Sequence, residues 1–327
     1  MKLLTRSELQ KCLTMADTIE AMEDAFAQLS SGVANVPPRI VLKVGDGTTL
    51  VMPAHLRNSH ALGLKAVSIH DPNVQRGIPA ILAFVALIDE DTGQLLALMD
   101  GTTITAIRTA AGSGLATKHL ARADAKIAAI FGAGPQGRAH ALAMCEVREI
   151  KEIRVTSAHQ ISAQTLAEEL RAKLPCDIRA VSAASDAVRG ADIICCCTNS
   201  SVPVFDGRDL RAGTHINSVG AYKTETTRET DDETIRRVSR IVVDSRTAAL
   251  LEAGDILVPI KAGIISEQDI YAELGEIVLG KKAGRQNDDE ITYFKSVGIA
   301  VQDIAAATVA LEHAEKLGLG STIDLSA

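Results

Sequence analysis

The stretch AKIAAIFGAGPQGRAHA, residues 125–141, decides the fold. An apolar run ends at a glycine-rich turn, and a helical pattern begins at Pro135, a residue suited to the first turn of a helix. Gly132, Gly134 and Gly137 have the G-x-G-x-x-G spacing, which allows a tight turn, the approach of a pyrophosphate and close helix–strand packing. The stretch therefore predicts a dinucleotide site at a helix start, the alternative being a tight turn in another α/β unit.

Composition narrows the class of protein. The chain has 327 residues, enough for two domains, a net charge of −7 and only 2% aromatic residues. An acidic chain with few aromatic side chains is not expected to bind nucleic acid. No apolar run is long enough for a bilayer, and the N-terminus lacks the apolar core of a signal peptide. We therefore expect a cytoplasmic protein without a membrane partner.

The cysteines predict no covalent framework. Three of them are adjacent in a strand-like run, a pattern that suits neither disulfide pairing nor a zinc site. We interpret them as small core residues in a reducing compartment, and we predict no metal site. The six are Cys12, Cys145, Cys176, Cys195, Cys196 and Cys197.

The N-terminal part predicts one helix followed by strands. Residues 14–30 have a helical apolar face, with Thr14 or Asp17 as the cap. In the strand 61–70, Lys65 shares a face with apolar residues, where a lysine is costly unless it is paired or functional. The alternative is a lysine at a sheet edge that reaches water. Two further strands are expected at 39–44 and 48–52.

A hairpin and a long helix follow. Residues 78–88 and 94–99 form the expected hairpin around the turn 89–93. The helix expected over 102–120 is rich in alanine and threonine, and it contains Arg108. The pattern alone leaves Arg108 open as either a buried anion-binding group or a surface residue.

From residue 125 the pattern alternates between strand and helix. Such alternation predicts an α/β fold, a doubly wound parallel sheet of the Rossmann type. We expect this dinucleotide-binding domain to span 123–303. A second, α+β domain for substrate binding and dimerisation would form from both chain ends, residues 1–122 and 304–327. Strands are expected at 126–131, 152–157, 177–181, 192–198, 214–219 and 240–244, and helices at 135–147, 161–173, 184–190, 231–238 and 246–253. The segment 289–303 precedes a helix that runs to about Lys316, and we interpret this tail as the chain crossing back to the first domain.

The end of the second strand of this sheet bears on coenzyme choice. About 20 residues past the glycines, an acidic residue normally binds the ribose of NAD. This chain has Ser157 and His159 there and no carboxylate, so a 2′-phosphate would not be repelled. The absence of an arginine leaves both NADP(H) and NAD(H) open. Thr198 and the segment 220–223 follow later strands and should border the cofactor.

Several separate segments resemble the ornithine cyclodeaminase/mu-crystallin family. The resemblance covers nearly the whole chain, and the segments occur in the family's order. It implies a Rossmann domain that binds a nicotinamide cofactor, a domain for a small amino or imino acid, and a homodimer. The matching segments are Pro38-Arg39, Met52–Ala54, Gly63–Lys65, Asp100-Gly101, Thr105–Ala111, Phe131–Gly137, Ile216–Gly220 and Ser296–Gly298.

The resemblance also assigns site residues. Arg39, Lys65 and Arg108 would hold the carboxylate of the substrate, as three cations close together would otherwise repel one another. Arg39 and Arg108 should then lower the pKa of Lys65, our candidate for the group that handles a proton or polarises the carboxylate. Cofactor-binding residues would be Gly132, Gly134, Pro135, Gln136, Gly137, Thr109, Ser157, His159, Thr198, Val219 and Ser296.

One position departs from part of the family. Cyclodeaminases and archaeal alanine dehydrogenases of this family have an aspartate where this chain has Tyr222. Deamination of a free amino acid needs a base, and a tyrosine is a poor base at neutral pH. Reduction of a cyclic imine requires only a bound carboxylate, a hydride donor and a proton source. The resemblance therefore favours an NAD(P)H-dependent reductase of cyclic ketimines, such as Δ1-pyrroline-2-carboxylate.

Three alternatives come from the same family. An ornithine cyclodeaminase would convert ornithine to proline and ammonia, and an alanine dehydrogenase would act on pyruvate and ammonia. A mu-crystallin-like binding protein would hold a ligand without catalysis. The intact set of Arg39, Lys65 and Arg108 argues against pure binding.

Overall fold

The computed structural model describes residues 1–220 and 227–325, so Tyr222 lies outside the described residues. Contacts within the chain divide it into unit 1, residues 1–108 and 299–327, and unit 2, residues 109–298. The sequence pattern suggested 122 and 304 as the boundaries. The first boundary instead lies inside the continuous helix α3 (Gly101–Leu120), because the first half of that helix contacts unit 1.

Unit 1 contains a seven-stranded sheet in the order β15-β1-β6-β5-β4-β3-β2. Strands β2 to β6 pair antiparallel in chain order, whereas β1 joins β6 in parallel. The expected strand at 78–88 begins only at Ile81, because a 3-10 turn at Asp71–Arg76 precedes it. The strands are β1 (Lys2–Leu4), β2 (Ile40–Val44), β3 (Gly47–Leu56), β4 (Ala61–Ile69), β5 (Ile81–Ile88), β6 (Leu95–Asp100) and β15 (Ser321–Thr322).

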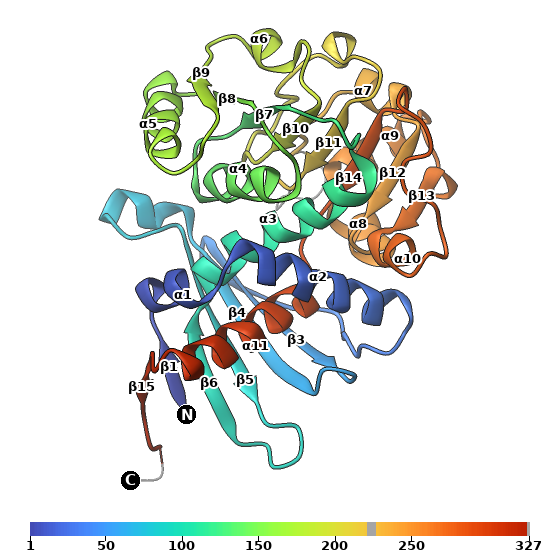
Figure 1. The fold of residues 1–327 in the computed structure, drawn as a ribbon. Helices are drawn as coiled ribbons and strands as arrows, with labels where there is room; N and C mark the ends of the chain where they lie inside the picture. The colour runs from blue at the N-terminus through green and yellow to red at the C-terminus, as the bar shows by residue number, and fades with distance from the viewer. Residues whose placement is uncertain (221–226, 326–327) are drawn as a thin grey trace. The chain divides into compact units, whose positions relative to one another are not determined.

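Helices cover one face of this sheet (Figure 1). Helix α11 (Ala300–Lys316) packs against α2 (Met15–Ser30) and lies on β3, β4 and β5. Thr14, one of the two caps that the sequence left open, caps α2 by accepting the N–H of Asp17. A short helix, α1 (Arg6–Cys12), was not predicted.

Unit 2 is a Rossmann-type unit, which confirms the predicted fold class. Its eight strands are parallel in the order β13-β12-β14-β11-β10-β7-β8-β9. The strand order reverses on the two sides of β7 (Ile127–Phe131), which creates the point where such sheets bind ligands. The other strands are β8 (Glu152–Thr156), β9 (Asp177–Ala180), β10 (Ile193–Cys196), β11 (His215–Ser218), β12 (Arg240–Val243), β13 (Ile270–Glu273) and β14 (Thr292–Lys295).

The helices of unit 2 largely follow the predicted alternation. Two were not predicted, α9 (Gly254–Lys261) and α10 (Leu274–Val278). Strands β13 and β14 were also missed, β14 because residues 289–303 were interpreted as a tail that returns to the first domain. Its four residues are buried and form a central strand between β11 and β12. The predicted helices are α4 (Pro135–Val147), α5 (Gln160–Arg171), α6 (Ala184–Val188), α7 (Asp232–Arg237) and α8 (Arg246–Glu252).

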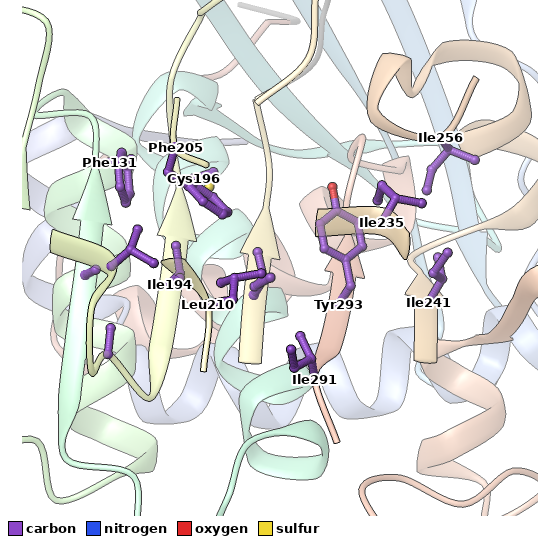
Figure 2. Packing of buried hydrophobic residues seen from close by; sticks show 14 of the residues in the cluster. Phe131, Ile194, Cys196, Phe205, Leu210, Ile235, Ile241, Ile256, Ile291 and Tyr293 are labelled. Atoms are coloured by element: carbon purple, nitrogen blue, oxygen red, sulfur yellow. The ribbon is translucent and has the colours of Figure 1, made fainter. Parts of the chain in front are cut away.

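Buried apolar side chains from the strands of unit 2 and the segments around them form its core (Figure 2). Phe131 and Phe205 lie with ring centroids 5.6 Å apart. Cys196 belongs to this cluster and the adjacent Cys195 is buried too, in agreement with their interpretation as small core residues, whereas Cys197 is half-buried. Burial raises the pKa of Cys195 to about 12, so its thiol is unreactive. Within residues 1–220 and 227–325, no helix is long and apolar enough to cross a membrane.

Candidate active site

Lys65 is a buried lysine on β4, with only 3% of the residue exposed. It lies opposite Met52 on β3 and Val85 on β5, both buried. Its Nζ atom lies 2.7 Å from Oδ2 of Asp303. The lysine is therefore neither at a sheet edge nor in water, and an acidic partner stabilises its charge inside the sheet.

Arg108, which lies on α3, binds the same carboxylate. Its Nε donates to Oδ1 of Asp303 at 2.9 Å, and its Nη1 donates to Oε1 of Gln302 at 2.9 Å. The residue is buried, so it is not the surface residue that the sequence left open. We call Lys65, Arg108, Gln302 and Asp303 the Asp303 cluster. It carries two positive charges and one negative charge.

Sequence reasoning missed Asp303, as it missed Gln302 beside it. Asp303 lies in the first turn of α11, where the helix dipole favours a negative charge. A Cβ on Gly63 would lie 2.9 Å from Ile304, so this glycine allows α11 to approach β4 closely. Asp303 precedes Ala306 and Ala310 on the apolar face of the helix, at helical spacing. A carboxylate within that apolar stripe was the signal that could have identified it.

The pKa of Lys65 is lowered to about 8. Burial is the largest cause, and the charges of Arg108 and Arg39 lower the pKa further, whereas Asp303 raises it. Arg39 is half-buried just before β2. The predicted direction of the shift is confirmed, although burial contributes more than the neighbouring cations.

The Asp303 cluster is suited to an anion. The two bonds of Arg108 use two of the five N–H groups of its guanidinium, and one positive charge of the cluster remains uncompensated. The Nε2 atom of Gln302 is buried and makes no hydrogen bond within the described part of the chain. Such a donor is expected to have a partner, so the cluster can offer N–H groups to a small carboxylate.

In unit 2, the turn between β7 and α4 has the geometry that a pyrophosphate requires. Gly132 has φ +104°, and a Cβ there would lie 2.5 Å from the carbonyl oxygen of Cys197. A Cβ on Gly137 would lie 1.9 Å from the carbonyl oxygen of Gly132. Gly134 caps α4, with Pro135 as the first helical residue, and a Cβ on Gly134 would meet no atom within 4 Å. The open side at Gly134 leaves room for phosphates next to the N–H groups of the helix start.

Four of the other predicted cofactor residues follow strands at their carboxyl ends, and two lie in helices. Ser157 follows β8 and is half-buried, and His159 is the exposed N-cap of α5. Thr198 follows β10, and Val219 follows β11, where its N–H donates to the carbonyl of Cys196. Gln136 is in the first turn of α4, and Thr109 is buried in α3.

Ser296 follows β14 but uses its hydroxyl within the protein. Its Oγ donates to Asp244 at 2.8 Å, and the same carboxylate accepts the N–H groups of Val297 and Gly298. The structure thus gives Ser296 a role in shaping its turn. Among the described residues, no group of three or more His, Cys, Asp or Glu side chains could hold a metal ion.

A doubly wound dinucleotide-binding unit, together with a separate unit that carries a buried cationic cluster, defines the class of protein. The chain belongs to the ornithine cyclodeaminase/mu-crystallin family, whose sequence model matches residues 1–317. The predicted family is thereby confirmed.

Relatives with named activities match this chain along nearly its whole length. A Δ1-pyrroline-2-carboxylate reductase of Bacillus cereus is 38% identical over 326 residues, 99% of this chain and 100% of the relative. Among solved structures, the Thermococcus litoralis Δ1-pyrroline-2-carboxylate reductase in complex with NADH and L-proline is 46% identical, with a TM-score of 0.94 over 99% of this chain and 100% of the other. An archaeal alanine dehydrogenase dimer with bound NAD is 33% identical, with a TM-score of 0.92 over 99% of each chain.

Proposed function

We propose that this protein is an NAD(P)H-dependent reductase of cyclic ketimines such as Δ1-pyrroline-2-carboxylate, which it converts to L-proline. The observation that carries the proposal is the buried Lys65–Asp303–Arg108 arrangement, because it offers a charged proton donor and a guanidinium in one place. The likeness to reductases with that substrate along the full chain supports it. Oxidation of NADH or NADPH on addition of the imine, with an equal amount of proline formed, tests it.

Each residue of the site has a distinct part in this reaction. The reduced nicotinamide, when bound, supplies the hydride that the imine carbon receives. Arg108 and Arg39 bind the carboxylate of the substrate and orient its ring. Lys65 gives a proton from Nζ to the ring nitrogen, so that the C=N bond becomes CH–NH. Asp303 holds the Lys65 ammonium in place.

In this proposal, unit 2 binds the cofactor. The N–H groups at the start of α4, beside Gly134 and Gln136, would bind the pyrophosphate. Ser157 and His159 would lie near the adenosine ribose, whereas Thr198, Val219 and Ser296 would border the nicotinamide half. Thr109 would lie near the phosphates.

The activity of the wild-type protein is expected to fall as pH rises through about 8. Lys65 must be protonated to act as a donor, and its pKa is about 8, so the active form is present below that pH. Asp303 raises this pKa. Asp303→Asn should therefore move the falling limb of the kcat/KM profile to lower pH.

Glu312→Gln is the matched control for this measurement, because Glu312 is exposed on the same helix. Its profile should coincide with that of the wild type. If the fall in kcat/KM occurs at the same pH in Asp303→Asn as in the wild type, the assignment of the proton to Lys65 is contradicted.

For the coenzyme, we expect kcat/KM with NADPH to equal or exceed that with NADH. The turn after β8 offers Ser157 and His159 and no carboxylate to repel a 2′-phosphate. Ser157→Asp should reverse the preference by at least about tenfold, because an acid there repels the phosphate and accepts the ribose hydroxyls. Gln164→Glu, which adds a similar charge further along α5, should leave it unchanged. A strong wild-type preference for NADH would contradict this interpretation.

The proposed assembly is a homodimer in which the sheet of unit 1 meets a second copy of the chain. Large apolar side chains on β2 and β5 are roughly half exposed, more than a monomer surface normally shows. A solved relative is described as a dimer. The side chains are Ile40, Val41, Leu42, Val44, Ile81, Leu82 and Phe84.

Light scattering is expected to give twice the chain mass of 34.5 kDa. Leu82→Glu should shift the protein toward the monomer, since a buried charge would oppose association. Leu251→Glu, at an exposed apolar residue of α8, should not change the mass. A wild-type monomer at micromolar concentration would rule out this assembly.

A further inference from the structure

A second buried group of charges lies in unit 2 and was not predicted from the sequence. Glu229, Asp255 and Lys295, here called the Glu229 cluster, are all at most 1% exposed. Lys295 Nζ lies 2.7 Å from Oδ2 of Asp255. Oδ1 of Asp255 accepts the N–H groups of Glu229 and Thr230 at 2.8 and 2.9 Å. The cluster contains two carboxylates and one ammonium, so its charges do not cancel when both acids are ionised.

Glu229 connects the turns that follow two neighbouring strands. Its Oε1 accepts the N–H and the hydroxyl of Thr198, after β10, at 2.6 and 2.8 Å. Its Oε2 accepts the N–H of Gly220, after β11, at 2.8 Å. Lys295 donates to the carbonyl of Gly220 at 2.9 Å. A Cβ on Gly220 would lie 2.0 Å from the carbonyl oxygen of Thr198, so the two turns are in close contact.

These turns lie at the carboxyl edge of the sheet, on the side of β7 opposite to β8 and β9. In a doubly wound sheet, one half of a dinucleotide binds to each side of the reversal in strand order. We propose that Glu229 is a positioning residue that ties the Thr198 and Gly220 turns into the wall against which the nicotinamide half of the cofactor binds. The inference rests on the proposed function for the identity of the cofactor.

The ionised carboxylate is the form that can accept all these hydrogen bonds. Burial is the main reason that the pKa of Glu229 rises to about 7. Of the groups that interact with it, Asp255 has a lowered pKa, and burial raises the pKa values of the three thiols. Protonation of Glu229 turns an acceptor into a donor and breaks a contact to one turn. The titratable groups that interact with Glu229 are Asp255, Lys295, Cys195, Cys196 and Cys197.

Calorimetric titration with NADH and with ADP-ribose, which lacks the nicotinamide, tests the proposal. Glu229→Gln should raise the Kd of NADH about tenfold, because its amide group cannot accept all the bonds that the carboxylate accepts. The Kd of ADP-ribose should remain unchanged. In the wild type, the Kd of NADH should rise as pH falls through about 7, whereas Glu229→Gln should show no such rise. NADH is used because the extra phosphate of NADPH titrates near 6.

Asp192→Asn is the matched control. Asp192 is a buried carboxylate that accepts the N–H groups of Lys126 and Ile127 at the amino end of the same sheet. Asp192→Asn should leave the Kd of NADH and the Kd of ADP-ribose unchanged. Equally weaker binding of NADH and ADP-ribose by Glu229→Gln would overturn this inference but not the proposed function. A wild-type NADH affinity that does not depend on pH would do the same. A wild-type protein that binds neither NADH nor NADPH would overturn the proposed function as well.

Discussion

Arg108→Leu is expected to raise KM for the imino acid at least about 100-fold, with little change in the affinity for NADH. Loss of a hydrogen bond to a charged group costs about 1.5–3 kcal/mol, and a 100-fold change corresponds to about 2.8 kcal/mol. The guanidinium is buried and already oriented by Asp303 and Gln302, so a substrate carboxylate meets it in a fixed position. Steady-state kinetics and calorimetric titration with NADH provide the two values.

A second variant separates the loss of binding from a loss of folding. Arg108→Lys keeps the charge but loses the planar fork, so it should raise KM by an intermediate amount, about tenfold. Thermal unfolding of both variants shows whether each of them still folds. A collapse of NADH affinity in either folded variant would show that Arg108 serves the cofactor and not the substrate.

The largest effect is expected in the choice between substrates. Ornithine should be deaminated at least about 1,000-fold more slowly than Δ1-pyrroline-2-carboxylate is reduced, because a positioned base contributes about 10²–10⁴-fold to rate. The sequence has Tyr222 at the position where its resemblance to the family implies an aspartate in the deaminating members. Tyr222→Asp should raise ammonia release from ornithine, whereas Tyr222→Phe should leave it as slow as in the wild type.

Much of the fold followed from local sequence patterns. The glycine spacing at 132–137 and the alternation after it predicted the Rossmann unit, because each element there carries its own periodicity. Strand β14 was missed, since four residues placed between β11 and β12 have no periodicity that distinguishes them from a tail. Its position depends on strands that are distant in the sequence.

Only part of the candidate site could be predicted from the sequence. Lys65 and Arg108 were visible because a charge on an apolar face is unusual. Their shared partner was not, because Arg108 and Asp303 lie 195 residues apart. Glu229 was missed for the same reason, since its bonds to Thr198 and Gly220 form only when the strands are aligned. Pairing of buried charges is a property of the packed chain and not of a local segment.

The most direct test of the central claim is a comparison of two reactions of the wild-type protein. In one, Δ1-pyrroline-2-carboxylate and NADPH or NADH are supplied, and the loss of nicotinamide absorbance is matched against the proline formed. In the other, ornithine and NAD are supplied, and ammonia is measured. We predict rapid reduction of the imine and little or no ammonia from ornithine. Ammonia release at a rate that rivals imine reduction would contradict the account and identify the protein as a cyclodeaminase.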